Sequence, residues 1–114
     1  MDVLQLDKQL NELIIQGKSG EAFLTFYAVD VIAQENDEPE RVGREAWIRG
    51  REEMEKNIKK FEARVLAHAA NGDVSFSEWD YNLELEGMGQ VRIHQVAVRR
   101  WKDGKVVRER FYHK

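Results

Sequence analysis

Short turn motifs divide the second half of this sequence into segments of strand length. Asn71-Gly72, Gly87-Met88-Gly89 and Asp103-Gly104 contain residues that tolerate positive φ, which tight turns between antiparallel strands require. The predicted strands are residues 62–70, about 74–86, about 91–101 and 106–113. Because consecutive strands joined by tight turns pair as hairpins, the sequence predicts a four-stranded antiparallel meander from residue 62 onward.

Helical periodicity dominates the chain before this meander. Apolar residues at spacings of three and four predict an amphipathic first helix, with a stripe formed by Val3, Leu6, Leu10, Leu13 and Ile14. Gly17 favours the end of that helix, and Ser19 is a suitable N-cap for a short second helix. The buried face of the second helix is expected at Ala22, Phe23, Phe26 and Tyr27. Residues 29–34 then alternate with period two, which predicts the first strand from Val29 to Gln34.

A third helix is predicted after an exposed loop. The loop runs from Glu35 to Gly43 and contains the only proline of the chain. The apolar residues that follow share one helical face: Trp47, Met54, Ile58 and Phe61. Charged residues, Arg51 among them, occupy the other side, which we interpret as a solvated helix face. Three helices with an early strand, followed by the meander, predict an α+β fold in one domain, residues 1–114.

Composition limits the classes of function. The formal net charge is −3, from 18 basic and 21 acidic residues, so we expect neither nucleic acid nor a membrane as a partner. The absence of cysteine excludes disulfides and thiol nucleophiles. No secretory leader or long apolar run is visible, so the expected location is cytoplasmic. No cofactor is expected, and three scattered histidines without paired spacing predict no metal site.

Four short motifs resemble those of one superfamily, in the same order and spacing. They are Tyr27-Ala28-Val29-Asp30, Val42-Gly43-Arg44-Glu45, Arg100-Trp101-Lys102-Asp103-Gly104-Lys105-Val106 and Glu109-Arg110-Phe111-Tyr112. Together they cover nearly the whole chain and resemble the nuclear transport factor 2-like superfamily, within it the SnoaL-like group. The resemblance implies a cone-shaped, curved antiparallel sheet wrapped around three N-terminal helices, with an apolar pocket at one end.

The same resemblance implies two classes of function. The first is a domain that binds a small, mostly apolar molecule, with acid–base chemistry like that of isomerases, cyclases or dehydratases as a possibility. The alternative is a non-catalytic homodimeric association or ligand-sensing module with a vestigial pocket. Because one fold hosts many activities, the fold does not choose between them.

One activity of the superfamily is excluded by the residues. By position, the ketosteroid isomerase base corresponds to Glu35, its tyrosine to Asn11 and its carboxylic acid to Ala97. An alanine side chain donates no proton or hydrogen bond, so the chain is not expected to be a ketosteroid isomerase. Whether it is another enzyme stays open. Glu35 remains a candidate catalytic carboxylate, with a solvated position in the following acidic loop as the alternative.

Alternation along the predicted strands places a candidate ligand pocket. Residues that share the inner face are Trp79, Tyr81, Gln95, Phe111 and His113. For the two aromatic residues of the long strand, core packing is the alternative, and for His113 a frayed end. Val74 and Phe76 have the opposite parity to Trp79 and Tyr81, so we predict a bulge near Ser77-Glu78.

Glu109 lies on the same inner face and is the second candidate catalytic residue. Buried without a cation, it would be a general acid or base. Paired with Arg99 on the preceding strand, it would stay ionised and be structural. The turn at Asp103-Gly104 brings the two strands together, which favours the pair.

The outer face of the sheet is the expected dimer interface. Strand parity places His94, Val96 and Val98 there, and the apolar pair would be exposed in a monomer. A homodimer is therefore predicted. His68, among alanines on an earlier strand, is expected to be half exposed.

Overall fold

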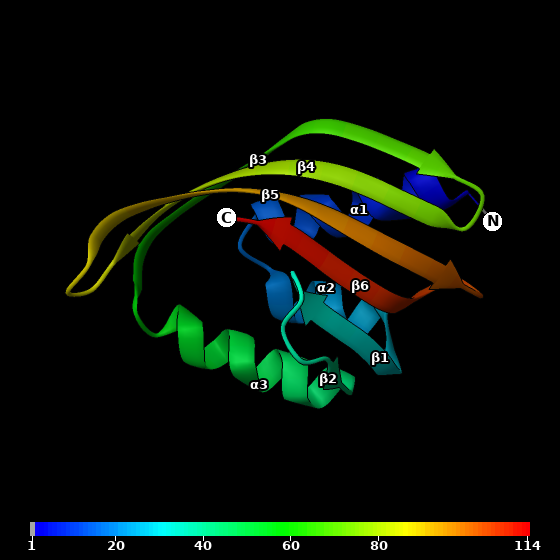
Figure 1. Ribbon diagram of the computed structural model, residues 1–114, viewed down its shortest axis with the longest axis horizontal. Helices are drawn as coiled ribbons and strands as arrows, with labels where there is room; N and C mark the ends of the chain where they lie inside the picture. Colours follow the sequence, from blue (N-terminus) through cyan, green and yellow to red (C-terminus); the bar gives the residue numbers. More distant parts are fainter. Residues whose placement is uncertain (1) are drawn as a thin grey trace.

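Three helices lie inside the curve of one unclosed, six-stranded sheet (Figure 1). The computed structural model describes residues 2–114. The helices are α1 (Val3–Ile15), α2 (Ser19–Phe26) and α3 (Arg44–Glu55). The strands are β1 (Tyr27–Glu35), β2 (Arg41–Val42), β3 (Ile58–Asn71), β4 (Val74–Leu85), β5 (Gly89–Lys102) and β6 (Lys105–His113). This architecture confirms the predicted α+β fold class.

The order of strands in the sheet is β2-β1-β6-β5-β4-β3. Strands β3 to β6 form the predicted antiparallel meander, with each strand paired to the next. Strand β1 lies beside β6 in parallel, and the short strand β2 pairs with β1 at the edge of the sheet. The last strand of the chain is therefore held between the first strand and the meander.

The first strand was predicted correctly, although it begins earlier than expected. The strand spans Tyr27–Glu35 and includes the predicted range Val29 to Gln34. Tyr27 was assigned to the second helix and instead opens β1, where its side chain is still buried. The loop that follows was expected to be wholly irregular, but Arg41–Val42 pairs with β1.

The predicted extent of the third helix is wrong. Helix α3 ends at Glu55, and Ile58 and Phe61 belong to β3. The register of β3 against β4 shifts between Ile58 and Lys60, which places an extra residue in β3 and keeps the apolar side chains on the inner face. A helical stripe and a bulged strand place the same residues toward the core, so spacing could not distinguish them.

The predicted bulge near Ser77-Glu78 is also wrong. Strand β4 pairs with β5 without a register shift, and Ser75 and Ser77 lie on the inner face with Trp79. Both serines accept indole hydrogen bonds of 2.9 Å, Ser77 from Trp79 and Ser75 from Trp101. Two small polar residues therefore face the core because their hydroxyl oxygens accept hydrogen bonds from the buried indole N–H groups. The bulge lies on the neighbouring strand, between Val65 and Ala67.

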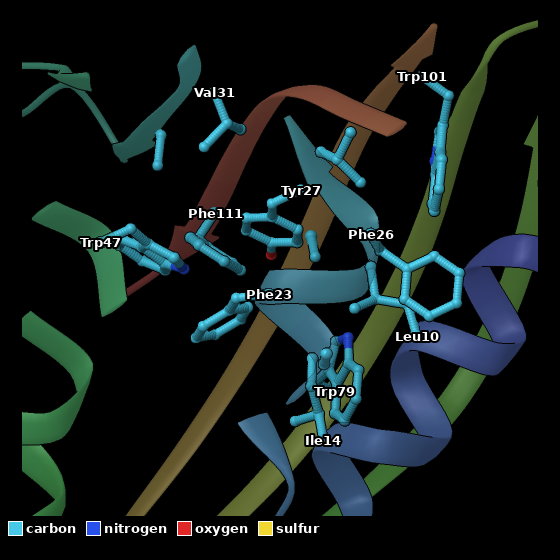
Figure 2. Packing of buried hydrophobic residues seen from close by; sticks show 14 of the residues in the cluster. Leu10, Ile14, Phe23, Phe26, Tyr27, Val31, Trp47, Trp79, Trp101 and Phe111 are labelled. Atoms are coloured by element: carbon cyan, nitrogen blue, oxygen red, sulfur yellow. The ribbon is translucent and has the colours of Figure 1, made fainter. Parts of the chain in front are cut away.

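The core fills the space between the helices and the concave face of the sheet (Figure 2). Leu10 and Ile14 of α1 approach Trp79 of β4, and Phe26 of α2 meets Trp101 edge-on at 6.2 Å. Toward α3, the rings of Trp47 and Phe111 stack at 5.8 Å. Among residues 2–114, no helix has the length and apolar character needed to cross a bilayer.

Candidate functional site

A cavity of about 220 Å³ lies between α3 and the sheet. Its wall is mostly apolar and includes Ile14, Phe23, Trp47, Phe61, Ile93 and Phe111. The side chains come from all three helices and from β1 and β3 to β6. The aromatic rings are held by one another, since Trp47 stacks on Phe111 and lies 6.1 Å from Phe23. A rigid apolar wall is typical of a small-molecule site.

Polar groups interrupt this wall at few places. Apart from Tyr27 and Arg99, the polar groups that border the cavity are the phenol of Tyr81 and the side chains of Glu35, Arg51, Gln95 and His113. Burial raises the pKa of Tyr81 to about 12, against the opposing effect of the Arg51 guanidinium. Tyr81 therefore remains a neutral hydrogen-bonding group at ordinary pH.

The buried end of the cavity is formed by Tyr27 and Arg99. The Arg99 guanidinium donates to two carboxylates, from Nε to Glu109 at 2.5 Å and from Nη1 to Asp7 at 2.8 Å. It also donates to Asn11 Oδ1 at 2.5 Å, and the Tyr27 hydroxyl donates to the second oxygen of Glu109 at 2.5 Å. All five side chains are buried. We call them the Arg99 network.

Electrostatics keep the Arg99 network charged despite its burial. Burial alone would raise the pKa of Asp7, but Arg99 holds it below its ordinary value. Burial likewise disfavours the charge of Arg99, yet Glu109 and Asp7 raise the pKa of the guanidinium well above its usual range. Burial and the neighbouring Glu109 raise the pKa of Tyr27 well above that of free tyrosine. Tyr27 therefore acts as a neutral donor.

His68 closes the Arg99 network from β3. Its Nε2 lies 2.5 Å from the second carboxylate oxygen of Asp7, and its side chain is 13% exposed. Because a carboxylate only accepts, Nε2 must carry the proton that is donated. The expectation of a half-exposed His68 was wrong, because the bulge between Val65 and Ala67 turns this part of β3 inward.

The two candidate catalytic residues lie in different surroundings. Glu109 is fully buried and paired with Arg99, so the structure shows the ion-paired alternative. Glu35 borders the cavity, with its side chain 40% exposed and one carboxylate oxygen 3.8 Å from His113 Nε2. Of the two carboxylates, only that of Glu35 borders the cavity.

Of the five residues predicted to line the pocket, all but Trp79 border the cavity. These are Tyr81, Gln95, Phe111 and His113. Trp79 does not border it, since it is fully buried and stacks on Tyr81 at 5.2 Å. Trp79 takes the core-packing role and supports the wall from behind.

The three residues predicted for a dimer interface lie on the outer face of the sheet. His94 is exposed and within 2.9 Å of Glu78 across the strands. Val96 is exposed, and Val98 is partly covered. Glu78 and Asp80 share this face, and Asp80 contacts Arg64 and Arg92.

Asp7 was missed by sequence reasoning, and Asn11 was considered only as the counterpart of the isomerase tyrosine. Both lie on the apolar stripe of α1, one turn apart, and a polar pair on a core face was the available signal. Arg51 was assigned to the solvated side of α3, but it borders the cavity with a side chain 20% exposed. Arg51 follows Trp47 by four residues, so helical spacing places it on the same face, and it was assigned to the solvated side only because of its charge. No three His, Asp or Glu side chains within residues 2–114 are arranged to hold a metal ion.

The helices and the curved sheet define a nuclear transport factor 2-like fold, which comparison with solved structures supports. The model of the SnoaL-like domain family matches residues 9–109, and the chain belongs to this family. No curated protein matches the sequence significantly.

Three solved structures illustrate the similarity. A Mesorhizobium loti protein described as a SnoaL-like polyketide cyclase is 24% identical, with a TM-score of 0.83 over 98% of this chain and 99% of that one. A Burkholderia pseudomallei protein of unknown function with the same fold is 13% identical, with a TM-score of 0.86 over 100% and 92%. An epoxide hydrolase from M. tuberculosis is 15% identical, with a TM-score of 0.81 over 98% and 82%. At these sequence identities, the structural similarity establishes the fold of this chain but not its activity.

The Arg99 network predicts a specific loss of stability in acid. Because the pKa of Asp7 is lowered by folding, its stabilising contribution is present above the pKa of the unfolded chain and is lost as the pH falls through the folded-state pKa. In that window the unfolded chain binds the proton first, so the free energy of unfolding falls as the pH is lowered. Asp7→Asn removes this contribution, so the difference in unfolding free energy between wild type and variant should shrink from about pH 5 to about pH 2. Urea unfolding across this range measures it.

The exposed Asp30 of β1 provides the matched control for Asp7. The Asp30→Asn variant should follow the wild-type pH profile throughout. A gap between wild type and Asp7→Asn that stays constant into acid would show that Asp7 contributes no charge-dependent stability.

Proposed function

We propose that this chain binds a small, mostly apolar molecule in the cavity between α3 and the sheet. The observation that carries the proposal is the composition of the wall, in which apolar side chains from every layer surround a few polar groups. Apolar area supplies affinity, and isolated polar groups supply orientation. A volume of about 220 Å³ suits a ligand smaller than a drug molecule, whose sites span roughly 300–1,000 Å³.

Two further features support this proposal. The rings of the wall are held by stacking, so the cavity is formed before a ligand enters. Two of the structural relatives bear names of enzymes with small organic substrates, a polyketide cyclase and an epoxide hydrolase.

Filling the cavity tests the proposal. Ile93→Trp places a larger side chain in the wall and should weaken binding of indole, a neutral aromatic probe, by about tenfold or more, because the probe loses its space. Calorimetric titration measures the binding. Leu24→Trp adds the same side chain at an exposed position on α2 and should leave binding unchanged. Equal indole binding by both variants, or none by the wild type, would contradict a ligand site in this cavity.

Acid–base chemistry is a second candidate function, favoured by the pair of Glu35 and His113. Both residues border the cavity, and the His113 Nδ1 lies 3.1 Å from the Lys114 carbonyl oxygen. If Nδ1 donates its proton to that oxygen, Nε2 is the unprotonated nitrogen of the neutral ring and can accept a proton. Nε2 is also the nitrogen nearest to Glu35. We propose His113 Nε2 as the general base, with its ring oriented by the contact of Nδ1 with the Lys114 oxygen, and Glu35 as the nearby carboxylate whose charge stabilises the imidazolium that forms.

Kemp elimination of nitrobenzisoxazole tests this pair with a small aromatic probe. The base removes the ring C–H proton while the N–O bond breaks, and the nitrogen becomes a nitrile as a coloured phenolate is released. His113→Gln should lower the protein-dependent rate by about 10² and Glu35→Gln by a smaller factor, since only the first removes the base. Glu38→Gln, in the exposed loop, is the matched control. A rate that equals buffer, or that survives His113→Gln, would contradict the base assignment.

Homodimerisation through the outer face of the sheet is a third proposal and is compatible with a sensing or association role. Large apolar side chains exposed on that face are Leu66, Phe76, Val96 and Tyr112. Charged residues border them, among them Glu78 and Arg92. An apolar strip with a charged rim is typical of a surface that a second copy covers.

Analytical ultracentrifugation at micromolar concentration tests the dimer. We expect a mass twice that of the monomer, and Val96→Glu should shift the population to monomer because it places a charge within the apolar strip. Val29→Glu makes the same change at an exposed site on β1 and should have no effect. A wild-type monomer would remove the dimer proposal and leave the cavity proposal untouched.

A further inference from the structure

Arg51 is a cation at an apolar cavity without a hydrogen-bonded counterion among residues 2–114. Its side chain is 20% exposed, and it borders the cavity from the second half of α3. The nearest carboxylate oxygen, on Glu55, lies 3.5 Å from Nε and makes no hydrogen bond. Glu55 is itself nearly half exposed, so its charge is largely screened by solvent.

Two side-chain donors on the inner face of α3 have no hydrogen-bond acceptor. Trp47 and Arg51 are one helical turn apart, and Trp47 Nε1 and Arg51 Nε are both buried without an acceptor in the part of the chain that the structure describes. Buried donors without acceptors cost free energy, and in native proteins each one calls for an explanation such as a bound molecule. Both residues border the same cavity.

Tyr81 provides a second polar group near Arg51. Its phenol borders the same cavity as the Arg51 guanidinium. Burial raises the pKa of Tyr81 to about 12, so the hydroxyl keeps its proton at ordinary pH. The hydroxyl is therefore a donor for an acceptor in the cavity.

Two arginines among the described residues border the cavity, and Arg99 is already hydrogen-bonded to Asp7 and Glu109. In the same part of the chain, the one carboxylate near Arg51 is that of Glu55, which is nearly half exposed and lies 3.5 Å from Nε. Arg51 is thus the arginine that an incoming anion can bind. Glu35 would repel an anion, but it is 40% exposed, and solvent weakens this repulsion.

We propose that the ligand of this cavity is a small apolar molecule that carries a carboxylate, bound by the Arg51 guanidinium and the Tyr81 hydroxyl. A carboxylate accepts several hydrogen bonds and matches the planar fork of a guanidinium. Apolar residues on either side, such as Ile93 and Phe61, would cover the hydrocarbon part of the acid. The inference rests on the proposed small-molecule site and names the class of ligand for it.

Matched pairs of acids and amides test the inference on the full chain. The acids are benzoate, phenylacetate and hydrocinnamate, and each neutral primary amide has nearly the same shape as its acid. At least one acid should bind about tenfold or more tightly than its amide, because a charge-assisted pair forms only with the acid. NMR titration measures both affinities up to millimolar concentration.

Variants then assign the preference to its residues. Arg51→Gln should abolish the preference by weakening the acid and leaving the amide unchanged, and Tyr81→Phe should weaken the acid by a smaller factor. Arg49→Gln, exposed on the same helix, is the matched control and should bind like wild type.

Each remaining outcome would overturn the proposal. If amides bind as tightly as acids, the cavity is a ligand site but not one for carboxylates. If Arg51→Gln weakens acid and amide equally, Arg51 acts by packing and not by charge. If neither acids nor amides bind while indole does, the cavity is still a small-molecule site, but the inference that its ligand carries a carboxylate is wrong. If indole also fails, both proposals are wrong.

Discussion

The structure depends on one buried arginine. Arg99 of β5 binds Asp7 of α1 and Glu109 of β6, and Tyr27 of β1 completes the coordination of Glu109. These residues are separated by up to 102 positions in the sequence, yet the Arg99 network joins the first helix, the first strand and the last two strands. Removing Arg99 would leave two buried carboxylates without their cation, so the elements are held in one arrangement.

The cavity follows from this arrangement. Arg99 and Tyr27 of the network border its buried end, while α3 approaches the sheet through the stacked pair of Trp47 and Phe111. The wall of the cavity is mostly apolar, with polar groups at a few points, among them Arg51 of α3. The folded arrangement thus maintains the cavity that we propose as a ligand site.

Sequence predicted the fold because its signals are local. The Asn71-Gly72 and Asp103-Gly104 turns and the alternation of β4 to β6 determined the meander and its faces. The Arg99 network was only partly predictable: strand parity paired Arg99 with Glu109, but Asp7 joins them from a contact across the core. The side of α3 on which Arg51 lies was predicted wrongly because its charge was given more weight than its spacing of four residues from Trp47, which places both on one helix face.

The most direct test of the central claim, that the Arg99 network organises the molecule, is the free energy of unfolding of Arg99→Met. The substitution keeps much of the volume and leaves two buried carboxylates without their cation, which should cost about 3–5 kcal/mol relative to wild type. Arg100→Met, at the next and exposed position of β5, should change it by less than about 0.5 kcal/mol. Equal unfolding free energies for the two variants would contradict the account.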